Sequence, residues 1–208
     1  MKHYLTAVLM LSLATVHSIH VWGAESAVGQ CANAIPLSAD ASFLKTAFND
    51  AKGKVRLLFV VDPICPACLR GAADMSRQVL DRHRGDSNLE TLVVHLPVIG
   101  GKESDTRRTC KALSGPAITH YWDSSGDFGR VLSKGIGLKS KSGKEVYAWD
   151  VWLLYGREAE WIGASPPRPA KLMHQLMALS DGSDYEFFDA QAFAESVTQA
   201  LGASVPNR

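Results

Sequence analysis

Residues 55–70 read Val-Arg-Leu-Leu-Phe-Val-Val-Asp-Pro-Ile-Cys-Pro-Ala-Cys-Leu-Arg, and this stretch decides the fold. Its first seven residues are almost all apolar, which is typical of a strand buried on both faces. An Asp-Pro pair then ends the strand, because proline has no N–H to donate to a sheet. Cys65 lies where a helix would begin, with Pro66 at the first helical position and Cys68 one turn further. The stretch predicts a buried strand, a turn and a helix with a cysteine at its amino end.

That position has chemical consequences for the two cysteines. Free N–H groups and the helix dipole at a helix amino terminus stabilise a thiolate. Two cysteines one turn apart can close a small disulfide ring, and we expect only the first of them to face solvent. Cys65 is therefore the expected nucleophile, Cys68 the resolving thiol, and Pro66 and Ala67 between them are expected to tune the redox potential.

The amino-terminal residues 1–23 have the features of a secretory signal peptide. A short basic start precedes an apolar run of about a dozen residues, and small residues precede a cut after Gly23. We expect cleavage there and a periplasmic or secreted protein. An uncleaved anchor is the less favoured alternative, because histidines interrupt the run well short of the roughly 20 residues of a span. The residue before Cys31 is glutamine, which argues against a lipoprotein, and we do not expect an integral membrane protein after cleavage.

Export changes the interpretation of the four cysteines, since disulfides persist outside the cytosol. Cys65 and Cys68 form the local pair. Cys31 and Cys110 remain, and they either form a structural disulfide or stay two independent thiols. Spacing alone does not decide between these alternatives.

The rest of the chain predicts one α/β domain over residues 38–203, with a flexible lead-in at 24–37 and a tail at 204–208. A strand, a helix and a second strand in succession imply a right-handed parallel crossover. The expected helices cover residues 41–51, 66–82, 103–113, 128–133, 170–179 and 190–201. The expected strands cover residues 55–61, 89–98, 146–155 and 159–162, the last two as an antiparallel hairpin, and residues 118–122 form a further short segment.

Charge and aromatic residues give no sign of a nucleic-acid partner. The 208 residues include 22 Lys and Arg against 21 Asp and Glu, and no basic block is interleaved with aromatic residues. A local group of lysines at 134, 139, 141 and 144 could meet an acidic partner, but a solvated loop is the favoured interpretation. Trp149, Trp152 and Trp161 are expected to pack in the core or at its rim.

With the motif at residues 59–68, Phe-Val-Val-Asp-Pro-Ile-Cys-Pro-Ala-Cys, the chain resembles the thioredoxin-fold superfamily, and in particular exported thiol:disulfide oxidoreductases. The order of elements agrees with this resemblance over roughly residues 38–201. It implies a thioredoxin-like mixed sheet with flanking helices and with amino- and carboxy-terminal extensions. It also implies the same division of roles between Cys65 and Cys68. The expected partners are protein thiols or disulfides and a membrane redox partner, and no cofactor is expected.

The chain departs from the family pattern at two places. Thioredoxins have a buried carboxylate six residues before the first cysteine, where this chain has Phe59; Asp62 is closer to the motif, and we expect it to be more exposed. The family also has a cis-proline before the strand that faces the site, whereas Trp149 and Asp150 stand at the matching place. Asp150 is therefore expected near the two sulfurs, and Asp62, Asp150 and Trp149 are expected to support the site together with Pro66 and Ala67.

These departures leave three functional interpretations. The favoured one is an extracytoplasmic thiol:disulfide oxidoreductase. In the second, the lost proline allows Cys65, Cys68 and Asp150 to hold a soft metal such as Cu(I) or Zn(II), as in a metal-binding or redox-enzyme assembly factor. No histidine has ligand spacing to the cysteines, and we assign no metal site. In the third, the Cys65–Cys68 bond is purely structural.

Overall fold

The computed structural model describes residues 34–179 and 185–203. The predicted signal peptide, Cys31 and the tail at 204–208 lie outside the described residues, so the predictions made for them stay predictions. Within the described ranges, every helix is too short or too polar to span a bilayer.

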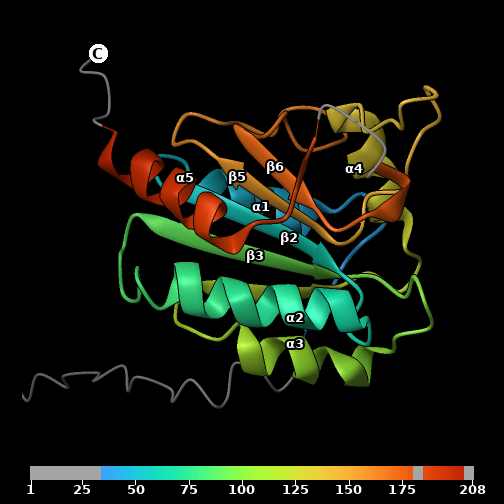
Figure 1. The fold of residues 1–208 in the computed structure, drawn as a ribbon, viewed down its shortest axis with the longest axis horizontal. Coiled ribbons are helices and arrows are strands. Elements are labelled where there is room, and N and C mark those ends of the chain that lie inside the picture. The colour runs from blue at the N-terminus through green and yellow to red at the C-terminus, as the bar shows by residue number, and fades with distance from the viewer. Residues whose placement is uncertain (1–33, 180–184, 204–208) are drawn as a thin grey trace, which may run out of the picture.

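A seven-stranded sheet organises the domain, in the order β1-β4-β3-β2-β5-β6-β7 (Figure 1). β2 lies at its centre and pairs in parallel with β3 and antiparallel with β5. The strands are β1 Ile35–Pro36, β2 Val55–Val61, β3 Leu89–His95, β4 Ile118–Trp122, β5 Val151–Tyr155, β6 Lys171–His174 and β7 Glu186–Phe187. This central arrangement of parallel and antiparallel neighbours, with helices on both faces, is the thioredoxin-like mixed sheet that the sequence predicts.

The helices cover both faces of the sheet, so β2 is buried along its whole length, as its apolar run predicts. Side chains of α1 and α4 pack with Leu58 and Val60 on one face, while those of α2 and α5 pack with Leu57 and Phe59 on the other. The ribbons of α2 and α5 lie on the viewer's side of the sheet in Figure 1. The helical segments are α1 Ser42–Asp50, α2 Pro66–Met75, η1 Ser76–Leu80, η2 Glu103–Asp105, α3 Thr106–Ala112, α4 Asp127–Ile136, η3 Met177–Leu179 and α5 Ala190–Gly202. The predicted cap of the last helix is confirmed, because the Asp189 carboxylate accepts hydrogen bonds from two of its first N–H groups.

The region between residues 146 and 179 differs from the prediction. The strand expected from residue 146 begins only at Val151, and the hairpin strand expected at 159–162 is wrong. Its antiparallel place beside β5 is taken by β6, where the sequence predicts a helix over 170–179. Leu172 and Met173 fit either a helix or a strand in isolation, and the ladder to β5 decides between them. The sheet also begins earlier than residue 38, because β1 pairs with β4.

Residues 159–162 are held by tertiary contacts in place of a ladder. The Trp161 side chain is buried, as expected for core packing, and lies edge-on against Phe48 with 6.0 Å between ring centroids. Its backbone N–H donates to the Asn49 side chain at 2.9 Å. Trp152 is buried as well, which confirms packing for both tryptophans.

Arg56 makes an unexpected polar contact set inside the apolar run of β2. Its guanidinium is fully buried and donates to the backbone carbonyls of Phe48 at 3.3 Å, Ala159 at 2.9 Å and Arg157 at 3.0 Å, and also to that of Gly156. It lies 4.6 Å from the centroid of the Phe48 ring. This one side chain therefore ties the turn after β5 to α1.

A second buried polar set joins β3, β4 and α3. His95 Nε2 lies 2.9 Å from His120 Nδ1, and the Thr109 hydroxyl lies 3.2 Å from His95 Nδ1. His120 Nε2 lies 2.8 Å from the Leu113 carbonyl, to which it donates. Both rings are buried, so His95 is a core histidine whose two ring nitrogens both have hydrogen-bond partners.

This pair makes stability depend on pH. Burial lowers the pKa of both rings, and His120 lowers that of His95 further. Since each folded pKa lies below the unfolded value of about 6.5, the unfolded chain binds more protons in mild acid, and stability falls as the pH falls through that value. Other groups also titrate between pH 7.5 and 5.5, so the comparison is with a His95→Gln/His120→Gln variant: we expect the urea midpoint of the wild type to fall relative to that of the variant as the pH is lowered across this range. An equal pH dependence in both proteins would contradict this assignment.

Candidate active site

Cys65 and Cys68 stand at the start of α2, where the sequence places them. Cys65 is the N-cap residue, with φ −68° and ψ 122°, and its Sγ accepts a hydrogen bond from the Cys68 backbone N–H at 3.4 Å. Pro66 occupies the first helical turn, where its missing N–H costs nothing. Both cysteines are free thiols, so the structure describes the dithiol state.

The two thiols differ strongly in acidity. The pKa of Cys65 is lowered to about 6, first by the hydrogen bond from the Cys68 side chain and then by backbone N–H groups of Cys68 and Ala67, against burial and the charge of Asp62. The pKa of Cys68 is raised, because its thiol donates to Cys65, is fully buried and lies near the charge of Asp150. At neutral pH Cys65 is therefore largely a thiolate, and Cys68 holds its proton.

Asp150 lies beside both sulfurs, in the position that the sequence predicts. One carboxylate oxygen of Asp150 and the sulfurs of Cys65 and Cys68 all lie within 4.8 Å of one another. The residue precedes β5 with φ 50°, in the left-handed region that Asp and Asn adopt more readily than most residues. Burial, and next the charge of Cys65, raise its pKa to about 7, although the neighbouring Cys68 thiol and the charge of Arg70 act the other way.

Gln175 completes the surroundings of Asp150 and was missed by the sequence analysis. With its amide oriented to satisfy both partners, its side-chain N–H groups donate to Asp150 Oδ1 at 3.0 Å and to the Ala67 carbonyl at 3.2 Å. Its backbone N–H also donates to the Asp150 carbonyl at 3.0 Å. The sequence did not predict this residue, because a helix was expected over 170–179. The structure has a strand there, and the end of that strand brings Gln175 to the site.

Asp62 is buried, so the prediction that it would be more exposed is wrong. Its two carboxylate oxygens accept hydrogen bonds from the backbone N–H groups of Ile64 at 2.9 Å and Ile99 at 2.8 Å. These bonds join the turn after β2 to the turn after β3. The carboxylate shapes the loop that presents Cys65, in addition to its charge effect on that thiol.

Phe59, which stands where thioredoxins have a carboxylate, is wholly apolar in its contacts. Its ring packs under α2 against Trp152, with 4.9 Å between centroids, and against Phe193 at 6.4 Å. Asp150 from the facing segment is therefore the carboxylate that lies at the two thiols.

A groove of about 630 Å³ opens beside Cys65. Residues 144–150 form one side and residues 175–178 the other. Trp149, which the sequence assigns to the site or its rim, is half-buried and lines this groove next to Ala67. Cys65 therefore opens into a groove that is also lined by the segment that carries Asp150.

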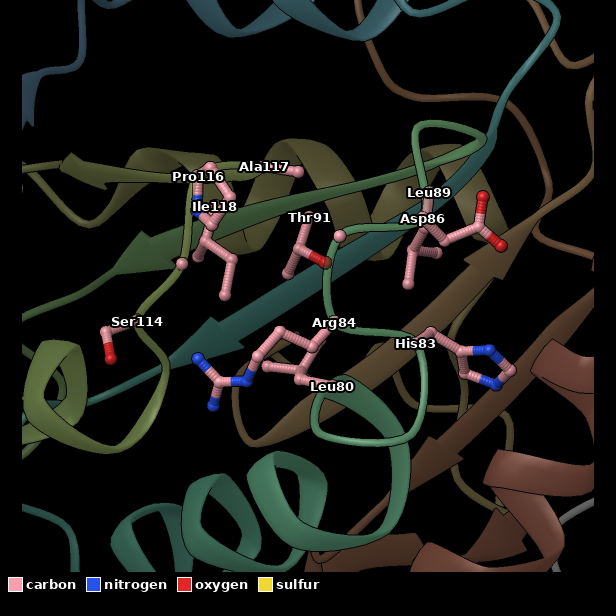
Figure 2. A pocket seen from close by; sticks show the side chains of 12 residues that line it. Leu80, His83, Arg84, Asp86, Leu89, Thr91, Ser114, Pro116, Ala117 and Ile118 are labelled. Carbon is pink, nitrogen blue, oxygen red and sulfur yellow. The ribbon is translucent and has the colours of Figure 1, made fainter. Parts of the chain in front are cut away.

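A smaller pocket of about 40 Å³ lies at the opposite end of the sheet. Figure 2 shows it between Leu80 at the end of η1, His83 and Arg84 in the turn that follows, and Ile118 at the start of β4. These residues lie at the amino ends of the parallel strands, whereas Cys65 follows the carboxyl end of β2. The pocket is separate from the thiol site.

The two cysteine sulfurs and one Asp150 oxygen lie close enough together to bind a soft metal ion. Cys65, Cys68 and Asp150 are the one group of three potential ligands found among the described residues, and no histidine joins them. Two sulfurs and one carboxylate oxygen suit Cu(I) or Zn(II). Cys110 is buried on α3, but Cys31 lies outside the described part of the chain, so their pairing stays a prediction.

Comparison with known proteins gives a likeness of fold. No family model matches the chain, and no curated protein matches it. A SCO1/SenC family lipoprotein from Bacillus anthracis is 11% identical with a TM-score of 0.47, over 73% of this chain and 83% of that one. A thiol:disulfide interchange protein of the thioredoxin family from Chlorobium tepidum is 14% identical with a TM-score of 0.43, over 74% and 83%. An exposed lipoprotein thioredoxin from Streptococcus pneumoniae is 18% identical with a TM-score of 0.40, over 72% and 87%. At these values no activity is transferred to this chain.

Proposed function

We propose that this protein is an extracytoplasmic thiol:disulfide oxidoreductase that exchanges disulfides with other proteins through Cys65 and Cys68. The observation that carries the proposal is the pair of unequal thiols at the start of α2, with the Asp150 carboxylate within 4.8 Å of both sulfurs. The signal peptide expected over residues 1–23 supports the compartment. Protein substrates reach Cys65 through the adjacent groove.

The lowered pKa of Cys65 and the raised pKa of Cys68 set the order of the steps in the exchange. The Cys65 thiolate attacks one sulfur of a substrate disulfide, the substrate S–S bond breaks, and the other substrate sulfur leaves as a thiolate that takes up a proton. Cys68 then loses its proton and attacks Cys65 Sγ, which releases the second substrate thiol. The protein ends as a disulfide and the substrate as a dithiol, so two electrons have passed to the substrate. A second thiol:disulfide couple, which we place at the membrane, restores the protein.

Asp150 has the position to take the proton that Cys68 must lose. One of its carboxylate oxygens lies within 4.8 Å of the Cys68 sulfur, and its raised pKa of about 7 matches a proton acceptor that works near neutral pH. Because Phe59 supplies no carboxylate on β2, the base comes from the facing segment. Gln175 holds that carboxylate by donating to it and to the Ala67 carbonyl.

Trapping variants test the proposal. We expect the reduced protein to reduce a protein disulfide, Cys65→Ser to have no activity, and Cys68→Ser to accumulate a mixed disulfide visible by mass spectrometry. Alkylation of Cys65 by iodoacetamide should rise with a midpoint near pH 6, which is the pKa of that thiol. No reaction with any disulfide, or unchanged turnover by Cys65→Ser, would contradict the proposal.

Metal binding is the second candidate, favoured by the same three donor atoms. A metal would need Cys68 as a thiolate, and the raised pKa of that thiol makes this costly. We therefore rank exchange first. Retention of one equivalent of Cu(I) or Zn(II) by the reduced protein through gel filtration, lost in Cys65→Ser, would reverse that order.

A further inference from the structure

The groove beside Cys65 is mainly apolar. Val146, Tyr147, Trp149, Leu176 and Met177 line it together with Ala67. Met177 is 78% exposed, although most large apolar side chains in the described residues are buried. Exposed apolar side chains along a groove mark a binding surface, and methionine adapts to varied apolar partners.

A positively charged loop borders the same groove. Residues 137–145 connect α4 to the groove wall and fold back on themselves through a bridge between Lys139 and Glu145. The Ser140 N–H also donates to the Lys144 carbonyl at 2.9 Å. This loop projects from the body of the molecule (Figure 1). Ser140, Lys144 and Glu145 line the groove that Cys65 opens into, so the loop and the nucleophile share one surface.

The charge of this loop is local and uncompensated. Lys139, Lys141 and Lys144 are exposed, and the ion pairs formed between described residues include none of them. Glu145 is the one acidic residue of the loop. The whole chain is almost neutral, so three lysines here are a local concentration of charge. Exposed Arg70 at the start of α2 adds a further positive charge near Asp150.

We propose that the groove binds an extended polypeptide segment in which apolar residues adjoin the reacting cysteine and acidic residues flank them, against loop 137–145. The inference rests on the proposed exchange function and names its substrate class. The apolar walls take the residues next to the cysteine, and the lysines attract the flanking carboxylates. Glutathione is also acidic, but it is a polar tripeptide and has no side chains for the apolar walls. The favoured occupant is therefore a protein segment.

Peptide disulfides of equal length test the inference. Three peptides carry the same apolar residues around one cysteine, in a mixed disulfide with the same small thiol, and differ only in acidic, neutral or basic flanks. At about 0.01 M salt we expect the reduced protein to react about 10-fold faster with the acidic than with the basic peptide, because opposite charges raise the association rate. At about 0.3 M salt this preference should largely disappear, because added salt shortens the range of charge interactions.

Two charge variants locate the effect. Lys139→Gln/Lys141→Gln/Lys144→Gln should lose the preference for the acidic over the basic peptide. The matched control removes three exposed arginines from η1 and the turn after it, at the far end of α2 from Cys65: Arg77→Gln, Arg82→Gln and Arg84→Gln. This control should retain the preference, although its net charge changes equally.

The outcomes separate this inference from the proposed function. Equal rates for the acidic and basic peptides at low salt, or a preference unchanged in the lysine variant, would overturn the inference while exchange itself stands. Oxidised glutathione reacting faster than every peptide would also overturn it. Failure to react with any disulfide, dithiodipyridine included, would overturn the proposed function and the inference with it.

Discussion

Asp150→Asn slows the resolving step about 100-fold and leaves the first attack by Cys65 nearly unchanged; this is the expected result if Asp150 is the base for Cys68. The asparagine cannot accept a proton, so the mixed disulfide persists. Asparagine adopts the left-handed backbone at φ 50° as readily as aspartate, so the segment before β5 should keep its shape.

Rapid quenching and mass spectrometry measure the two steps separately. In the wild-type protein the resolving rate should rise with the ionisation of Asp150, with a midpoint below pH 7 because Cys65 carries no charge in the mixed disulfide, and this rise should be absent from the variant. Asp81→Asn, at an exposed carboxylate, is the control and should match the wild type. An unchanged resolving rate in Asp150→Asn would remove Asp150 from the mechanism, without affecting the roles of the cysteines.

The same substitution should increase stability at alkaline pH. The folded pKa of Asp150 is raised from 3.8 to about 7, so its contribution to stability is fully present below 3.8 and is lost as the pH rises through about 7. At pH 8 Asp150→Asn should therefore be more stable by on the order of 4 kcal/mol, and at pH 4 the difference should largely vanish. A variant that is more stable but resolves the mixed disulfide more slowly shows the pattern of a residue kept for function.

Arg56→Met is expected to lower the free energy of unfolding by about 3–5 kcal/mol. Methionine fills part of the volume but donates no hydrogen bonds, so the carbonyls of Phe48, Gly156, Arg157 and Ala159 lose their donor inside the protein. In a domain of this size the loss corresponds to a fall of about 8–15 °C in Tm.

Urea and thermal unfolding measure this effect. Arg82→Met is the matched control, because Arg82 is exposed and donates to the Gln78 side chain at 2.6 Å. It should change stability by less than about 0.5 kcal/mol. A loss below about 1 kcal/mol in Arg56→Met would mean that water or backbone movement replaces the lost bonds.

Some features of the fold follow from residues close together in the chain. The apolar run 55–61 is β2, the helix after Cys65 is α2, and Asp189 caps α5, because strand burial, capping and proline placement act over a few residues. The strand at 159–162 and the helix over 170–176 were assigned wrongly, and in the second segment Leu172 and Met173 have no local preference strong enough to exclude a helix. Pairing with β5, which lies about twenty residues earlier in the chain, made that segment a strand.

The candidate site likewise combines features that the sequence predicts with features that only the tertiary structure shows. The order of residues along the chain was sufficient to place Cys65 as nucleophile and Cys68 behind it, because both lie on one helical turn. The resemblance to thioredoxins was sufficient to bring Asp150 near them. The burial of Asp62, the amide of Gln175 at the Asp150 carboxylate, the donation of Arg56 to four carbonyls and the pairing of His95 with His120 appeared only in the tertiary structure. Each depends on groups that are distant in sequence and meet only when the sheet has formed, and hydrogen bonding and desolvation act on the distance between atoms in space.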